Sequence, residues 1–189
     1  MGAGGGVLGL VVLLASLFLP KLLGAGTSTT SLGSTSGRSA ETADGVCSSE
    51  IEQIVCGATQ DVQTYWSAAL PQFFGTRHAA TKTVFFAGGT DTGCGTASSQ
   101  SGPFYCPLDR LVYIDLDVMQ QLENQLVGST TDLAEQYIVA HEYGHHVQDL
   151  VGTDAQVRQA QRNDPGRANQ YSVALELQAD CYAGAWSAM

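Results

Sequence analysis

Three of the chain's four histidines and one glutamate fall within the nine residues AHEYGHHVQ, at positions 140–148. On an α-helix, residues four apart share a face and lie about 5–6 Å apart, so His141 and His145 can bind one ion. His146 is turned by about 140° from His141 around the helix axis, so it cannot easily share that ion. The spacing therefore selects His141 and His145 as metal ligands. It predicts that His146 is exposed or hydrogen-bonded nearby.

Glu142 directly follows the first histidine and completes the pattern HExxH. In this pattern the two imidazoles bind zinc, and the glutamate takes a proton from the zinc-bound water. We therefore predict one Zn2+ per chain, with Glu142 as the catalytic base. Gly144 lies in the same helix, where glycine costs about 0.5–1 kcal/mol relative to alanine. This cost indicates that another backbone or a ligand passes close by, although simple tolerance of the glycine also fits the sequence.

A catalytic zinc usually has three protein ligands and an open position. Downstream of His145, Glu176 and Asp180 in ELQAD are four residues apart and share a helix face. Glu176 is the candidate third ligand, and Asp180 can accept the spare N–H of a ligating histidine and fix its tautomer. On spacing alone, a solvated acidic face is an equal alternative. Apolar neighbours predict a buried helix, in which carboxylates need a partner. These neighbours are Val173, Leu177, Cys181 and Trp186.

Hydrophobic spacing predicts the elements that position these residues. The helical segments are 48–74, 118–126, 132–151 and 171–186, with Asp132 and Glu135 as the start signal of the third. The strand-like segments are 82–89 (KTVFFAGG) and 111–118 (LVYIDLDV), and the segment 92–107 between them predicts a turn-rich loop. The order of a helix, short strands and two long helices predicts an α+β domain, mostly helical with a small sheet.

Four segments taken together resemble a known family: AHEYGHHVQ, ELQADCYAGAW, GPFYCP and VYIDL. They are similar to the putative neutral zinc metallopeptidase family of bacterial membrane-anchored proteins, from about Trp66 to Trp186. The resemblance implies a zincin-like fold, with zinc bound by His141, His145 and Glu176 and with Glu142 as the base. Asp180 matches the family's aspartate one turn after the glutamate. Family members usually continue past the last helix, so we expect the domain to be C-terminally truncated here.

The first 45 residues differ in composition from the rest of the chain. Residues 2–20 carry no charge, and 7–19 are almost continuously apolar. This predicts an N-terminal transmembrane helix at 1–23, which just reaches the roughly 17–25 residues needed to span a bilayer. The alternatives are a cleaved signal segment, with a cleavage site at 24–26, and a buried core helix. Residues 24–45 are rich in Thr, Ser and Gly and predict a flexible linker. Residues 46–189 then form one compact domain.

The net charge of −10 arises from only eight Lys and Arg against eighteen Asp and Glu. No basic stripe exists that could follow phosphates, so nucleic acid is not an expected partner. Direct binding to an anionic lipid surface is disfavoured for the same reason. Contact with a membrane is therefore expected only through the N-terminal segment.

The five cysteines include no CxxC motif, so a zinc ribbon is not indicated. Behind a membrane anchor we expect disulfides formed in an oxidising compartment, Cys94–Cys106 first and Cys47–Cys56 second. The catalytic domain would then lie outside the cytoplasm in a single-pass membrane protein, or be secreted if the segment is cleaved. Free thiols in a cytosolic domain are the alternative. Cys181 is left over and is expected to be a small buried side chain.

These observations favour a zinc endopeptidase acting on peptide or protein substrates. KTVFF or LVYIDL would be the edge strand to which an extended peptide adds. Candidates for stabilising the oxyanion are Tyr105, Tyr113 and Tyr171. His78 has no partner at metal spacing, so we expect a surface or core histidine. One alternative is an envelope protein with a structural zinc site, although closed structural sites favour four Cys or His ligands. The other is a plain soluble domain with a coincidental motif.

Overall fold

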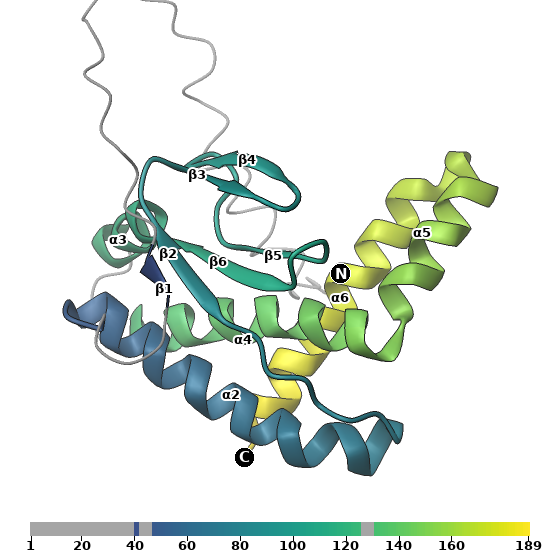
Figure 1. The fold of residues 1–189 in the computed structure, drawn as a ribbon, viewed down its shortest axis with the longest axis horizontal. Helices are drawn as coiled ribbons and strands as arrows, with labels where there is room; N and C mark the ends of the chain where they lie inside the picture. The colour runs from purple at the N-terminus through teal and green to yellow at the C-terminus, as the bar shows by residue number, and fades with distance from the viewer. Residues whose placement is uncertain (1–39, 42–46, 126–130) are drawn as a thin grey trace, which may run out of the picture. The chain divides into compact units, whose positions relative to one another are not determined.

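The computed structural model describes residues 40–41, 47–125 and 131–189 (Figure 1). Its helices are α2 (Glu50–Phe74), α3 (Leu116–Gln125), α4 (Thr131–Val151), α5 (Thr153–Asn163) and α6 (Ala168–Ser187), with the 3-10 turn η2 (Pro165–Arg167) before α6. Its strands are β1 (Ala40–Glu41), β2 (Thr83–Phe86), β3 (Gly89–Thr92), β4 (Gly95–Ser98), β5 (Phe104–Cys106) and β6 (Leu111–Asp115). Long helices and a small sheet agree with the predicted α+β class.

Most of the predicted N-terminal anchor and linker lies outside the described residues. The exception is β1, which pairs with β2, so this part of the predicted linker is not a free tether. Within the described ranges, no helix is long and apolar enough to cross a bilayer.

The main sheet has the strand order β1-β2-β6-β5. β2 and β6 are parallel, whereas β5 is antiparallel to β6 and β1 is antiparallel to β2. Side chains alternate between the two faces of the sheet. Phe85, Val112 and Ile114 join the helical core, while Val84 and Phe86 pack with Tyr113 in a second cluster. Both faces of the central strands are therefore covered.

The edge of this sheet differs from the prediction. KTVFF and LVYIDL form β2 and β6, which both lie inside the sheet, so neither is the edge strand. The edge next to β6 is β5, which lies in the segment 92–107 predicted as a loop. That segment also contains β4, which pairs with β3 in a separate hairpin. These strands have only three or four residues, too few for a clear alternation of apolar and polar side chains.

α2 begins at a reciprocal cap and ends at a glycine. The Ser49 hydroxyl accepts from the Glu52 backbone N–H at 3.2 Å, and the Glu52 carboxylate accepts from the Ser49 backbone N–H at 2.9 Å. This bond and the Ser48 hydroxyl lower the pKa of Glu52 to about 2. Gly75 has φ 63°, the left-handed conformation that suits glycine after a helix. The predicted helix over 48–74 is confirmed.

α4 is the central helix of the packing and contacts α2, α6, β5 and β6 (Figure 1). It crosses α6 at Gly144. A Cβ on Gly144 would lie 2.9 Å from the Ala179 carbonyl oxygen and 3.0 Å from its Cα. Side chains are not accommodated at such distances, so only glycine allows this crossing. The predicted close approach of another backbone to Gly144 is confirmed.

α6 is less buried than its apolar residues suggested. Its buried face is formed by Ala179, Tyr182, Ala183 and Trp186. Val173 and Leu177 are 41% and 48% exposed, and Cys181 is an exposed free thiol, so the prediction of a buried Cys181 is wrong. Residues 173, 177 and 181 follow one another at intervals of four along one face, whereas Trp186 lies on the opposite face. The four residues therefore never indicated a single buried stripe.

Glu135 is buried near the start of α4 and has no hydrogen-bond partner on either carboxylate oxygen. The helix begins at Thr131, close to the predicted start, but the capping role expected of Glu135 is not seen. Burial, together with the negative charges of Glu123 and Asp132, raises the pKa of Glu135 to about 7, and burial contributes most. Near neutral pH this carboxyl group destabilises the fold.

Glu135→Gln should therefore stabilise the protein in a pH-dependent way. Because the folded-state pKa is raised from 4.5 to about 7, the wild type is most stable below 4.5 and loses stability as the pH rises through 7. At pH 8 the variant should be more stable by about 1–2 kcal/mol, and this advantage should shrink as the pH falls towards 4.5. Thermal unfolding at pH 5 and pH 8 measures the difference. Asp91→Asn, at an exposed position whose charge is not among those that act on Glu135, is the control. An equal advantage at both pH values would contradict the assignment.

Gly144→Ala should destabilise the α4–α6 crossing by about 1–3 kcal/mol, because the added methyl group must push the two helices apart. The matched control is Gly184→Ala on α6, where no atom lies within 4 Å of the position of a Cβ. That change should be neutral or stabilising by up to about 1 kcal/mol. Denaturant unfolding of both variants tests this prediction. Equal losses of stability would show that the crossing does not depend on Gly144.

Candidate metal centre

α4 and α6 bring His141, His145 and Glu176 together. The Glu176 carboxylate oxygen Oε2 lies 3.1 Å from His141 Nε2 and 3.4 Å from His145 Nε2. One possible ligand atom from each of the three residues falls within 4.8 Å of the others. The two imidazole rings come from one helix face, with centroids 4.9 Å apart. The α4–α6 crossing adds the carboxylate from a residue 31 positions after His145.

Asp180 lies on the outer side of His141, one helical turn after Glu176. Its Oδ1 is 2.9 Å from His141 Nδ1 and also accepts a hydrogen bond from the Tyr137 hydroxyl at 2.7 Å. A carboxylate oxygen only accepts, so Nδ1 carries a proton, and Nε2, which faces Glu176, is the nitrogen that a neutral His141 would offer to a metal. The sequence pattern did not predict Tyr137, although it precedes His141 by four residues and so shares its helix face.

His145 has a different partner on its outer side, the side-chain amide of Gln148. His145 Nδ1 lies 2.9 Å from Gln148 Oε1. Gln148 is fully buried, and the sequence pattern did not predict it. With this partner, His145 also directs Nε2 towards Glu176.

Two imidazole nitrogens and one carboxylate oxygen therefore converge, and either N–H groups of protonated imidazoles or a bound metal ion can bridge them. The pKa values of the two histidines and of Glu176 also indicate that this site favours a positive charge. Burial opposes protonation of His145, but hydrogen bonding to Glu176 and the charge of Glu142 outweigh it and raise its pKa to about 9. The same competition raises the pKa of His141. Hydrogen bonds from the two histidines hold the pKa of Glu176 well below its usual range.

The donor set fits zinc. Two imidazoles and one carboxylate are a ligand combination of catalytic zinc sites, which keep one position open for water or substrate. Both histidines also have their other ring nitrogen hydrogen-bonded, as ligating histidines almost always do. The residues present are therefore able to hold Zn2+ with an open position.

Glu142 is buried beside these residues, with 7% of its surface exposed. Burial raises the pKa of its carboxyl group, whereas His145, His141 and the backbone N–H of Tyr105 act to lower it. A carboxylate with a raised pKa binds a proton more strongly than an exposed one. Glu142 is therefore a buried carboxyl group next to the candidate metal ligands, and its burial favours the protonated form.

The site opens into a cleft of about 320 Å³. Pro103, Phe104, Tyr105 and Pro107, from β5 and its flanks, line the cleft together with Asp154 of α5 and Leu175 of α6. The metal-ligand candidates and Glu142 also line it, and among the described residues no Lys or Arg does so. The cleft is therefore partly apolar and acidic.

The hydroxyl of Tyr105 is engaged away from the metal-ligand candidates. It donates to Asp149 Oδ2 at 3.1 Å and lies 3.1 Å from Nδ1 of His146, a buried residue. His146 also donates from Nε2 to the Ala79 carbonyl at 2.6 Å, so the hydrogen-bonded alternative predicted for it is confirmed. His78 lies edge-on to His146, with ring centroids 6.0 Å apart. These contacts fix β5 to α4 through side chains.

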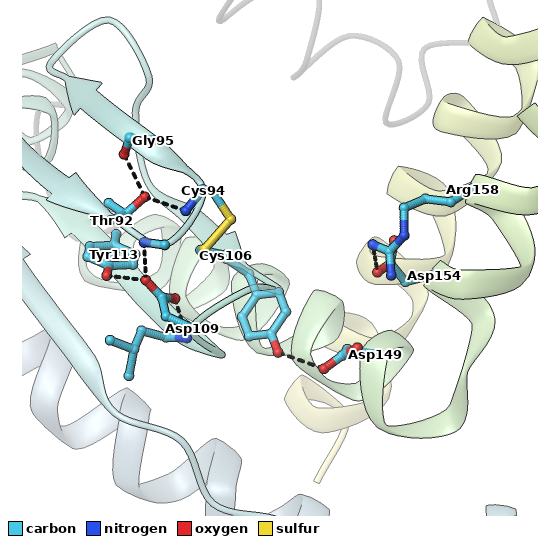
Figure 2. Close-up of a disulfide and its surroundings, with 12 residues drawn as sticks. Thr92, Cys94, Gly95, Cys106, Asp109, Tyr113, Asp149, Asp154 and Arg158 are labelled. Carbon is cyan, nitrogen blue, oxygen red and sulfur yellow. Dashed lines mark hydrogen bonds and ion pairs between the residues drawn. A yellow bond between two sulfur atoms is a disulfide. The ribbon is translucent and has the colours of Figure 1, made fainter. Parts of the chain in front are cut away.

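The other two tyrosine candidates for the oxyanion are not among the residues that line the cleft. Tyr113 donates its hydroxyl proton to Asp109 at 2.7 Å (Figure 2). Tyr171 stacks under the Arg167 guanidinium near the start of α6. Of the three, only Tyr105 lies at the cleft.

Both expected disulfides are present. Cys94–Cys106 joins the turn between β3 and β4 to the last residue of β5 (Figure 2). Asp109 strengthens this junction, because its carboxylate accepts from the Gly93 backbone N–H at 2.7 Å. Cys47–Cys56 ties the residues before α2 to its second turn. The first disulfide therefore secures the strand that forms one wall of the cleft.

Comparison with known proteins gives relatives from distant bacteria. The chain is 42% identical over 134 residues to the uncharacterized protein YpfJ of Escherichia coli K12, covering 70% of this chain and 45% of that protein. It is 44% identical over 133 residues to the uncharacterized proteins Rv2575 of Mycobacterium tuberculosis H37Rv and Mb2605 of Mycobacterium bovis, covering 70% of this chain and 42% of each. The chain thus matches less than half the length of these relatives. No solved structure matches it.

The model of one protein family, described as putative neutral zinc metallopeptidase, matches residues 1–189. This agrees with the resemblance carried by the HExxH and ELQAD segments. The chain belongs to the putative neutral zinc metallopeptidase family.

Proposed function

We propose that the protein is a zinc-dependent endopeptidase. The observation that carries this proposal is the convergence of His141, His145 and Glu176 at a cleft, with Glu142 buried beside them. This two-His, one-Glu set leaves an open position, which a structural zinc site does not need. A zincin-like arrangement, with the HExxH helix below a sheet edge, is consistent with the contact between α4 and β5.

In the proposed reaction, Glu142 accepts a proton from the attacking water and later donates it to the leaving amine. A bound Zn2+ would polarise the scissile carbonyl and make the water more acidic. Because burial raises the pKa of Glu142, its carboxylate is a stronger base than an exposed one. Asp180 and Tyr137 hold His141 in the tautomer that leaves Nε2 free for the metal.

The open edge of β5 is the proposed binding surface for an extended peptide. Tyr105 pairs with Val112, whose backbone N–H is directed to the Lys82 carbonyl on the opposite side. In an antiparallel pair of this kind, the Tyr105 N–H and C=O point away from β6, towards the free edge. The N–H is close enough to Glu142 to lower its pKa. The Tyr105 carbonyl is therefore the group that a substrate N–H would meet.

The cleft also indicates which substrates would bind poorly. Its described lining includes no Lys or Arg, although Asp154 is paired with Arg158 beside it, and the whole chain carries a net charge of −10. Acidic peptides would be repelled from this surface. Peptides with apolar or basic side chains suit the proline, phenylalanine and carboxylate groups of the lining better.

For the location, we infer a domain held outside the cytoplasm by residues 1–23, or secreted after their removal. The two disulfides of the described domain support this, because disulfides persist in oxidising compartments. The apolar run at 7–19 supports the anchor.

Glu176→Ala should remove most of the zinc that the purified chain binds. The wild type should hold about one zinc per chain, and the loss of one of three ligands should abolish stoichiometric binding. Elemental analysis after dialysis measures the content. Asp154→Ala is the control, because Asp154 lines the same cleft but lies outside the ligand cluster. Zinc retained in Glu176→Ala would require a different third ligand.

Glu142→Gln should keep zinc bound and reduce peptide hydrolysis by about 10²-fold or more, since a positioned general base contributes about 10²–10⁴-fold. A library of quenched fluorescent peptides, with zinc content measured in parallel, tests this. A variant as active as the wild type would contradict the role of Glu142. A wild type that holds zinc but cleaves nothing in the library would favour the structural-zinc alternative.

A further inference from the structure

We propose that Gln148 is a positioning residue for the metal centre. It would fix the tautomer and direction of His145 and connect that ligand to the helix that carries Glu176. This inference rests on the proposed function, because it assumes that His145 binds a metal. It is independent of whether Glu142 hydrolyses a peptide bond.

Gln148 is buried completely, and all of its polar atoms have partners. Its Nε2 donates to the Leu175 backbone carbonyl at 2.7 Å and lies 3.1 Å from Gln178 Oε1. Its Oε1 lies 2.9 Å from His145 Nδ1. A side-chain amide has two N–H donors and one acceptor oxygen, so this environment uses both kinds of group. Since unpartnered polar atoms are costly in the interior, this network holds the amide in one orientation.

The orientation of the amide follows from the partner on α6. The backbone carbonyl of Leu175 can only accept a hydrogen bond, so the NH₂ group of Gln148 must face it. The oxygen of Gln148 must then face His145, and it also can only accept. His145 Nδ1 therefore carries a proton, and in the neutral ring that would bind a metal Nε2 keeps its lone pair. One backbone carbonyl on α6 thus determines the tautomer of a histidine on α4.

The two candidate histidine ligands reach the same tautomer through different partners. His141 faces the Asp180 carboxylate, whereas His145 faces a neutral amide. Glu142, Glu176 and Asp180 already place three carboxylates around the two imidazoles. A neutral partner orients His145 without placing a negative charge at the fully buried position of residue 148, where its desolvation would be costly.

Gln148 also links two ligands mechanically. Leu175 immediately precedes Glu176, so the hydrogen bond from Gln148 holds the backbone next to the third ligand candidate. The same side chain therefore constrains His145 directly and Glu176 through its neighbour. A residue that served only helix packing would not need a polar bond to each side.

Measuring zinc affinity distinguishes a role of Gln148 in positioning the ligands from a role in helix packing alone. We would compare the full chain with Gln148→Leu and with Gln148→Met, which is closer to glutamine in length; both remove the donor and the acceptor. The matched control is Gln161→Leu. Gln161 makes a similar bridge from α5 to the start of α6, with Nε2 bound to the Ala168 carbonyl at 3.2 Å and to Ser172 Oγ at 2.9 Å. It has no contact with the metal-ligand candidates.

Competition with a chromogenic chelator gives the zinc dissociation constants, and the absorption of the Co2+-loaded chain reports the coordination geometry. Gln148→Leu should bind zinc about 10–100-fold more weakly and change the Co2+ spectrum, as expected when the outer partner of a ligand is lost. Gln148→Met should weaken zinc binding to a similar extent. Gln161→Leu should bind zinc like the wild type. Circular dichroism confirms that each variant is folded.

Three outcomes would overturn the proposal. Wild-type affinity in Gln148→Leu would show that Gln148 does not position the ligand. Equal weakening in Gln161→Leu would indicate a general effect of helix packing. Wild-type affinity in a folded Gln148→Met would exclude this role as well, even if Gln148→Leu itself fails to fold. A wild type that binds no zinc would instead refute the proposed function, which distinguishes the two failures.

Discussion

The candidate metal centre depends on the close crossing of α4 and α6. α4 alone provides two imidazoles on one face, which is fewer than the three protein ligands of a catalytic zinc site. The third donor comes from α6, and it reaches the histidines because Gly144 lets the Ala179 backbone approach where a methyl group would not fit. Further polar contacts act across the same interface: Asp180 to His141, Tyr137 to Asp180 and Gln148 to Leu175. Together they orient both rings towards Glu176.

A second set of contacts holds the wall of the cleft in place. β5 is only three residues long, yet three independent connections fix it. It pairs with β6, its last residue is bonded to Cys94, and the Tyr105 side chain reaches Asp149 and His146 on α4. The Tyr105 hydroxyl is therefore committed to support of the strand, while its backbone faces the cleft. His146, which the HExxH geometry leaves out of the ligand set, belongs to this support.

The sequence predicted the parts of the site that depend on one helix. Fixed helical spacing relates His141, Glu142 and His145, and it also relates Glu176 and Asp180. Only the contact between the two helices depends on tertiary structure. The edge strand was missed because Phe104–Cys106 is too short for a periodic signal and lies among turn residues. Gln148 and Tyr137 were missed because their partners lie on α6, far away in sequence. The burial of α6 was overestimated because its apolar residues occupy opposite faces, and Glu135 was taken for a capping residue although tertiary packing buries it without a partner.

X-ray absorption spectroscopy at the zinc edge of the zinc-loaded chain would test most directly whether His141, His145 and Glu176 hold the metal. We predict two imidazole nitrogens at about 2.0–2.1 Å and oxygen ligands at about 2.0–2.2 Å, with no sulfur. A sulfur ligand at about 2.3 Å would contradict this assignment and implicate Cys181, the free thiol of the described residues. A shell of three or more imidazoles would contradict it as well, because it would bring His146 or His78 into the site in place of Glu176.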